Sequence, residues 1–173
     1  MRNRKLMALA IPFVLVIALG VSALANGQSS SFGARLRGYD EVPAINSAGT
    51  GQFTASINSS GTEITYKLTY SGLSSSAVAA HIHLGQRGVA GGVVAFLCGG
   101  GTKPACPSSG GTVSGSIVAS DIQALSAQGI AAGDLASLLR AMRAGVTYVN
   151  VHSTNFPGGE IRGQVSVQEG DQD

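Results

Sequence analysis

Three histidines are the residues of this chain whose type and spacing could carry metal chemistry. His81 and His83 form an H-x-H pair, and His152 lies far downstream in a second alternating segment. Because residues i and i+2 of a β-strand point to the same face, His81 and His83 share one face. By the same rule His152 shares a face with Asn150. The opposite face of each segment is aliphatic, so all three imidazoles belong to the more polar faces.

A three-histidine metal site is compatible with this spacing. Residues i and i+2 of a strand have Cα atoms roughly 6.5–7 Å apart, and a neighbouring strand lies about 4.8 Å away. Metal–nitrogen bonds of about 2.0–2.1 Å require ligand nitrogens within roughly 4 Å of one another, which leaning imidazoles can reach. Imidazole-only ligation suits copper or zinc, with an open fourth position for water or a substrate. The alternative is that the histidines face solvent or bond to loops, with Asn150 as a partner.

Other catalytic patterns are missing from the sequence, which contains no G-x-S-x-G and no H-E-x-x-H motif. Asp40 and Glu41 are neighbours in a predicted loop, so they point in different directions and form no obvious acid–base pair. Glu160 and Arg162 share a strand face, and we predict a surface ion pair worth up to about 1 kcal/mol. With Asn150, these two residues are the candidate outer partners of the histidines.

Cys98 and Cys106 are the only cysteines, and we predict that they form a disulfide. Two cysteines of an exported protein usually pair, and the glycine-rich residues 99–105 are flexible enough to close a small loop. Free or metal-binding thiols are the alternative. This alternative has less support, because seven residues separate the cysteines, rather than the two to four of a zinc knuckle.

The N-terminus has the features of an export signal. A basic start precedes an apolar run from Leu6 to Val21, and Ala23–Ala25 is an A-x-A cleavage site. We therefore predict a signal peptide over residues 1–25, cleaved after Ala25, and a secreted, periplasmic or cell-envelope protein. An uncleaved anchor is the alternative, although the run is at the short end for a membrane span of roughly 20 residues.

Removal of the leader changes the net charge from +2 to about −1, because eight basic residues then face nine acidic ones. Nothing basic remains that would indicate nucleic acid or an anionic membrane, and no membrane attachment is expected after cleavage. A partner in the extracellular space or envelope stays open, and the sequence does not name one. We expect residues 26–31 to be flexible and 168–173 to be a disordered tail.

The elements that must position the histidines are strands, because period-two alternation dominates the chain and predicts an all-β fold. Charged residues make up only 12% of the chain, and glycine is abundant, as in turn-rich β-domains. We expect an antiparallel Greek-key sandwich or barrel of about eight strands, forming one domain over residues 32–167. The predicted strands are residues 34–37, 52–57, 64–70, 78–84, 92–97, 112–118, 146–152 and 160–167.

One stretch, residues 120–144, departs from the alternation and predicts a short helical connection. Ser120 to Gln123 has the pattern of a capping box, which starts a helical turn. From Asp134 to Ala144 the apolar residues recur at i, i+3, i+4 and i+7, and Gly145 ends the helix. We expect this helix to cover one end of the sandwich with its apolar side. The residues on that side are Leu135, Leu138, Leu139 and Met142.

Three motifs resemble the CHRD (chordin-type) domain, and together they span nearly the whole mature chain. They are Ala34–Pro43 (A-x-L-x-G-x-x-E-V-P), Ala80–His83 (A-H-I-H) and Tyr148–Gly163 (Y-V-N-V-H-S-x-N-x-P-G-G-E-I-R-G). The last motif is long and specific. The resemblance implies an extracellular or envelope β-sandwich module, found alone in bacteria and repeated in chordin, whose molecular activity is poorly defined.

A fainter resemblance concerns the histidines. Residues 71–73 followed by His81 and His83 are similar to the copper/zinc superoxide dismutase segment that carries its first two copper ligands. Residues 149–152 are similar to its last copper-ligand strand, so His152 matches a third ligand. A fourth histidine is missing, which removes the bridging ligand and the zinc set. Arg162 does not clearly match the anion-guiding arginine of the dismutase.

These observations leave two main hypotheses for the function. The first is a non-enzymatic binding or structural module of the envelope or extracellular space, supported by the missing catalytic motifs and the near-neutral charge. The second is a copper- or zinc-binding protein that uses His81, His83 and His152. A dismutase-like redox activity has the least support, so the sequence leans against an enzyme. The distance between the imidazoles separates the two hypotheses. If the ring nitrogens of His152 lay more than roughly 8 Å from the His81–His83 pair, the three histidines could not share one ion.

Overall fold

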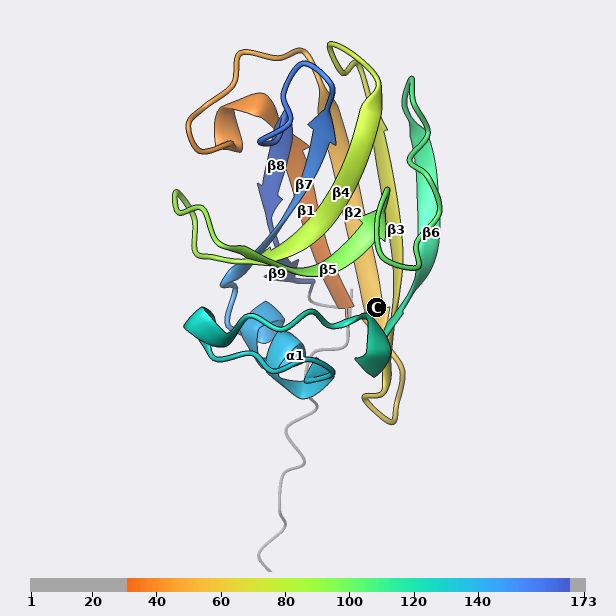
Figure 1. Ribbon diagram of the computed structural model, residues 1–173, viewed down its shortest axis with the longest axis vertical. Helices are drawn as coiled ribbons and strands as arrows, with labels where there is room; N and C mark the ends of the chain where they lie inside the picture. Colours follow the sequence, from red (N-terminus) through yellow and green to blue (C-terminus); the bar gives the residue numbers. More distant parts are fainter. Residues whose placement is uncertain (1–30, 169–173) are drawn as a thin grey trace, which may run out of the picture.

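The computed structural model describes residues 31–168 as a β-barrel with one α-helix (Figure 1). Its strands are β1 (Ser31–Arg37), β2 (Thr50–Ile57), β3 (Glu63–Ser71), β4 (Ala77–Leu84), β5 (Gly92–Cys98), β6 (Gly111–Val118), β7 (Thr147–Ser153), β8 (Ile161–Gln164) and β9 (Ser166–Val167). The helical elements are α1 (Leu135–Arg143) and the 3-10 turns η1 (Gly38–Asp40), η2 (Ala119–Asp121) and η3 (Ser126–Gln128). The all-β prediction is confirmed. Each predicted strand has a counterpart, and the last one is divided at the buried Val165 into β8 and β9.

All strands belong to one antiparallel sheet, in the order β5-β4-β7-β8-β1-β2-β3-β6, with β9 pairing beside β1. The sheet curls until β5 and β6 come into contact, which produces a nearly closed barrel (Figure 1). Strands β4, β5 and β6 follow one another, and β7 then returns to pair with β4. This return is the Greek-key connection that the sequence predicted. Its consequence is that the two histidine segments, in β4 and β7, become neighbours.

The barrel interior holds the aliphatic and aromatic side chains of the alternating strands. Phe53, Leu68, Ile82 and Val151 are fully buried, while their neighbours in sequence point outward. Because each strand alternates between the two faces, one side of the sheet supplies most of the core, and α1 contributes to it at one end. Burial of a large apolar side chain stabilises the fold by roughly 1.5–3 kcal/mol, so this interior supplies most of the favourable folding energy.

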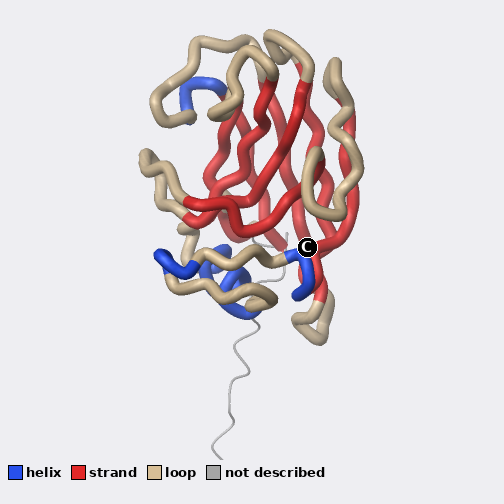
Figure 2. Tube along the Cα trace, in the orientation of Figure 1, coloured by secondary structure: helices blue, strands red, loops and turns tan. Residues whose placement is uncertain are grey.

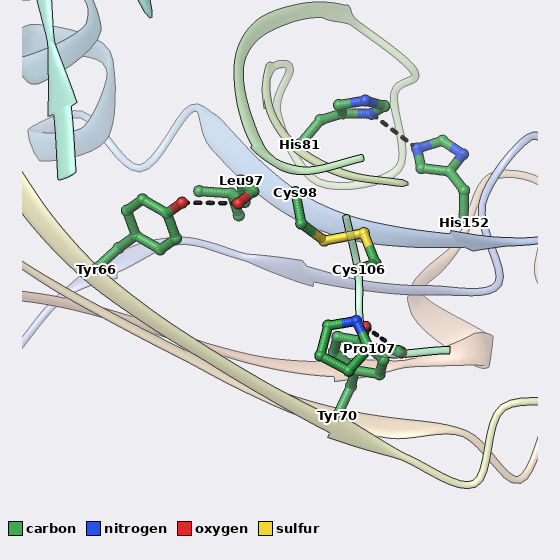
Figure 3. Close-up of a disulfide and its surroundings, with 8 residues drawn as sticks. All are labelled: Tyr66, Tyr70, His81, Leu97, Cys98, Cys106, Pro107 and His152. Carbon is green, nitrogen blue, oxygen red and sulfur yellow. Dashed lines mark hydrogen bonds between the residues drawn. A yellow bond between two sulfur atoms is a disulfide. The ribbon is translucent and has the colours of Figure 1, made fainter. Parts of the chain in front are cut away.

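Two buried tyrosines and the disulfide fasten the seam between β5 and β6 (Figure 3). Tyr66 Oη on β3 donates to the carbonyl oxygen of Leu97 on β5 at 2.7 Å, and Tyr70 Oη donates to Pro107 at 2.7 Å. Cys98 and Cys106 are bonded with an S–S distance of 2.01 Å, which confirms the predicted disulfide. This bond ties the end of β5 to the loop that leads into β6. The strands on both sides of the seam are therefore held without a hydrogen-bonded ladder.

Helix α1 lies across one end of the barrel, as Figures 1 and 2 show. Asp134 caps its N-terminus by accepting a hydrogen bond from the Ser137 N–H at 2.9 Å. The predicted apolar side is buried in the core: Leu135, Leu138, Leu139 and Met142. These observations confirm the predicted helix and its role as an end cover.

The predicted capping box at Ser120 is wrong in detail. The helical turn there, η2, begins one residue earlier, and the Asp121 carboxylate accepts from the Val118 N–H at 3.0 Å. The same carboxylate lies 2.9 Å from Lys103 Nζ in an ion pair that is largely buried. The chain then runs on extended, because the Gln123 N–H donates to Val94 on β5. Pairing with the barrel therefore separates η2 from the next helical turn, η3.

Residues 1–30 and 169–173 lie outside the part of the chain that the structure describes. The predicted signal peptide over 1–25, most of the segment 26–31 and most of the tail 168–173 fall there, and they stay predictions. Within residues 31–168, no helix is long and apolar enough to cross a membrane.

Candidate metal centre

Strand pairing places the candidate site residues side by side on the outer face of β4, β7 and β8. His81 lies opposite Asn150, and Asn150 lies opposite Arg162 on the next strand. One step along the same face, His83 lies opposite Tyr148. Residues directly opposite on antiparallel strands have Cβ atoms about 4.5–5.5 Å apart, so their side chains are in contact. The shared face that alternation predicted for the histidines is confirmed.

The three imidazoles converge on one point. One ring nitrogen from each of His81, His83 and His152 lies within 4.8 Å of the other two. His81 Nδ1 and His152 Nε2 are 3.0 Å apart, which Figure 3 marks with a dashed line. Two nitrogens at that separation fit on one metal ion with bonds of about 2.0–2.1 Å. The prediction that the three rings come close enough to share an ion is confirmed.

Backbone carbonyls fix the orientation of two of these rings. His83 Nδ1 lies 2.9 Å from the Gly91 oxygen, and His152 Nδ1 lies 2.8 Å from the Pro157 oxygen. Because a carbonyl oxygen only accepts, Nδ1 of each ring carries the proton and Nε2 keeps its lone pair. His83 Nε2 is buried and has no hydrogen-bond partner. Metal-binding histidines commonly have their second nitrogen held this way, which leaves the first free to coordinate.

This outer face is buried, which is the main departure from the sequence-based alternative of solvent-facing histidines. His81, His83 and His152 are 9%, 7% and 9% exposed. Three loops cover them: residues 38–49 after β1, 85–91 after β4 and 154–160 after β7. Two of these loops supply the carbonyl oxygens, of Gly91 and Pro157, that accept hydrogen bonds from His83 and His152.

The burial keeps the histidines neutral. Desolvation, together with charge repulsion from the nearby His152 and His83, lowers the pKa of His81 to about 3. Desolvation also lowers the pKa of His83, although its hydrogen bond to Gly91 opposes this effect. The pKa of His152 is lowered for the same reason. Neutral imidazole is the form that binds metal, so no proton has to leave these rings at neutral pH.

An aromatic stack supports the cluster on one side. Tyr148 lies parallel to His83, with ring centroids 4.6 Å apart and planes 8° apart. The guanidinium carbon of Arg162 lies 3.4 Å from the centre of the Tyr148 ring. Phe96 meets His81 edge-on at a centroid distance of 4.7 Å. These contacts restrict the rotation of His81 and His83 and so preserve the convergence of their nitrogens.

The predicted outer partners differ in what they do. Asn150 Oδ1 lies 3.0 Å from His152 Nε2, so Asn150 borders the cluster, although both atoms are acceptors in the tautomer that the Pro157 carbonyl selects. Arg162 donates from Nη2 to the carbonyl oxygens of Gln86 at 3.1 Å and Val89 at 2.9 Å. Its role is to hold the 85–91 loop over the histidines. Arg162 is only 2% exposed, and its charge is satisfied by these carbonyls and by the Tyr148 ring.

The predicted surface ion pair between Glu160 and Arg162 is wrong. Glu160 is fully buried and accepts from Ser47 Oγ at 2.6 Å and from the Ser74 N–H at 2.7 Å. Burial raises the pKa of Glu160, but hydrogen bonds from serines outweigh this effect and lower it below its ordinary value. The residue precedes β8 rather than lying within it, so the shared-face rule for strands does not apply. Glu160 therefore anchors two loops instead of contacting the histidines.

Glu41 belongs to the site, although the sequence analysis placed it in a loop and gave it no role. It is 8% exposed, and its Oε1 is buried without a hydrogen-bond partner. Desolvation raises the pKa of this carboxyl, while the Val42 N–H, the charge of Arg162 and the amide of Asn150 lower it. Glu41 is thus a buried carboxyl beside Asn150, which in turn lies next to His152. The sequence feature that could have pointed to Glu41 is its position in the first of the three motifs, Ala34–Pro43.

Comparison with known families identifies the class of protein. A family model described as the CHRD domain matches residues 32–165, which is most of the chain. The chain therefore belongs to the CHRD domain family, as its motifs predicted. No curated protein and no solved structure matched. Nothing in these comparisons supports the fainter similarity to copper/zinc superoxide dismutase.

Proposed function

We propose that this protein is an exported, non-enzymatic CHRD module that binds one copper or zinc ion through His81, His83 and His152. The observation that carries the proposal is the convergence of one nitrogen from each ring within 4.8 Å. A further support is His83 Nε2, which is buried and unpartnered. Leaving such an atom without a partner costs roughly 1–3 kcal/mol, and a bound ion would remove that cost.

The donor set favours these two metals. Three neutral imidazoles without carboxylate suit copper and zinc, and for a given nitrogen site copper(II) binds more tightly than zinc. The ion would supply a fourth coordination position, while the chain's own residues hold the three rings in place. Carbonyls of Gly91 and Pro157 set two of the ring orientations, and Tyr148 restricts His83 by stacking.

Export is supported by the leader-like sequence over residues 1–25 and by the Cys98–Cys106 disulfide, since disulfides persist in oxidising compartments. A module that only binds a macromolecular partner, with no metal, is the competing hypothesis. It requires the histidine cluster to be purely structural. A dismutase-like reaction has no support beyond the three histidines themselves.

The test is spectroscopic. Metal-free protein, prepared with a chelator, is titrated with Cu(II) and followed by electron paramagnetic resonance. We expect one copper per chain with hyperfine coupling to imidazole nitrogen, and we expect His83→Ala to abolish that signal. Arg140→Gln, an exposed change on α1, is the matched control and should bind as the parent protein does. Zinc binding is measured by competition against copper.

Two outcomes would overturn the proposal. The first is folded parent protein that gives no nitrogen-coupled copper signal and no zinc binding. The second is a copper signal that His83→Ala leaves unchanged. Circular dichroism of each variant separates loss of the ion from loss of the fold.

A further inference from the structure

The outer face of β1, β2 and β3 is open, in contrast to the histidine face. Its side chains follow the strand alternation and are exposed, and the register aligns them in rows across the sheet. In one row Arg35 lies opposite Gln52, which lies opposite Thr69. In the next, Thr54 lies opposite Lys67. The face is polar and rich in hydroxyl and amide groups.

Three adjoining depressions form one shallow groove across this face. Their volumes are about 460, 330 and 450 Å³. The first two share Arg35 and Gln52, and the second and third share Thr54 and Gln168. The groove therefore runs continuously across β1, β2 and β3. An extended chain fits such a surface better than a compact small molecule, because no part of it is enclosed.

The charge of the groove is of one sign. Among residues 31–168, Arg35, Arg37 and Lys67 line it and no carboxylate does. Arg37 pairs with Asp40 at 3.1 Å, whereas the side chains of Arg35 and Lys67 make no ion pair or hydrogen bond with any residue of the described range. The acidic residue of this face, Glu63, begins β3 and lies four positions from Lys67. Within the part of the chain that the structure describes, two cations without an ion-pair partner therefore project from a neutral polar surface.

We propose that this groove binds an acidic polysaccharide, a partner that goes beyond the metal function. Arg35 and Lys67 are two strands apart and offset by two residues along the strands, which separates their backbones by roughly 12 Å, a little more than the length of one disaccharide unit of a uronic-acid polymer. Hydroxyl and amide side chains between them can bond to sugar hydroxyls. The aromatic residues beneath the groove are all buried: Phe32, Phe53, Tyr66 and Tyr70. No ring is offered for stacking, which disfavours single-stranded nucleic acid and neutral sugars.

The experiment measures binding of full-length protein to immobilised polygalacturonate, with dextran and single-stranded poly(dT) as comparison polymers. We expect binding to polygalacturonate that weakens as salt is added, because 1 M salt reduces the screening length to about 3 Å. The double variant Arg35→Gln, Lys67→Gln should bind on the order of tenfold more weakly. The control Arg87→Gln, Arg140→Gln makes the same charge change elsewhere and should bind as the parent does.

Three results would overturn the proposal. They are absence of binding to polygalacturonate, equal loss in the control double variant, and binding to poly(dT) at least as tight as to polygalacturonate. The four substituted side chains are exposed, so the unfolding midpoints of both double variants should match the parent. Copper binding is measured on the same samples, and it should be unaffected by the groove substitutions.

Discussion

The outer faces of two parts of the barrel look alike in sequence and differ in structure. On β1, β2 and β3 the outward residues, such as Arg35 and Lys67, are exposed to solvent. On β4, β7 and β8 most outward residues, such as His81 and Arg162, are less than 10% exposed. In both regions the strands alternate polar outward residues with apolar inward ones. The difference shows that alternation identifies which face points away from the core. Whether that face is exposed to solvent depends on the loops that cover it.

Acid should produce the largest difference between the two faces. The pKa values of His81, His83 and His152 are lowered in the folded state, so the unfolded state binds protons that the folded state does not. Stability is therefore present above the ordinary histidine pKa of about 6.5 and is lost as pH falls through the lowered values. Each histidine contributes a loss of roughly 1.4 kcal/mol per pH unit in that range.

Urea unfolding of metal-free protein at a series of pH values measures this loss. His83→Asn removes one titrating group and should reduce the slope of unfolding free energy against pH between about 6 and 4. The double variant Arg35→Gln, Lys67→Gln changes the open face, where no histidine lies, and should leave the slope intact. An unchanged slope in His83→Asn would show that the cluster is not the acid-sensitive element.

One arginine on each face gives a second comparison. Arg162→Ala removes two hydrogen bonds to loop carbonyls and the contact with Tyr148, and it leaves the partly buried oxygens of Gln86 and Val89 without this donor. We expect a loss of about 3 kcal/mol in the free energy of unfolding. Arg35→Ala, on the open face, should change it by less than about 0.5 kcal/mol. Equal effects, measured by urea unfolding at neutral pH, would contradict the account of Arg162 as the anchor of the 85–91 loop.

Two adjacent glycines of the 154–160 loop give the smallest expected effect on stability. Gly159 has a φ of 126°, and an added Cβ would overlap Glu41 Oε1 and Asn150 Nδ2. Gly159→Ala should therefore destabilise the protein by about 2 kcal/mol and weaken copper binding. Gly158→Ala adds a Cβ with nothing within 4 Å and should do neither. Thermal unfolding with and without Cu(II) measures both effects, and a silent Gly159→Ala would show that the loop adjusts freely.

Much of the fold could be predicted because its signals are local. Period-two alternation located the strands, the i, i+3, i+4, i+7 pattern located α1, and two cysteines in an exported chain indicated the disulfide. The turn near Ser120 and the Glu160–Arg162 pair could not be predicted well. In both cases a long-range partner decided the outcome: Lys103 for Asp121, and Ser47 and Ser74 for Glu160.

The sequence by itself determined which residues point away from the core, and so which imidazoles share a face. It also determined the family, through motifs that extend over most of the domain. Only the tertiary structure decided that β7 returns beside β4, which brings His152 to His81 and His83. It also decided that three loops bury them and that Glu41 joins them. The physical reason is that alternation is set by backbone geometry within a strand, whereas burial and convergence depend on contacts between residues distant in sequence.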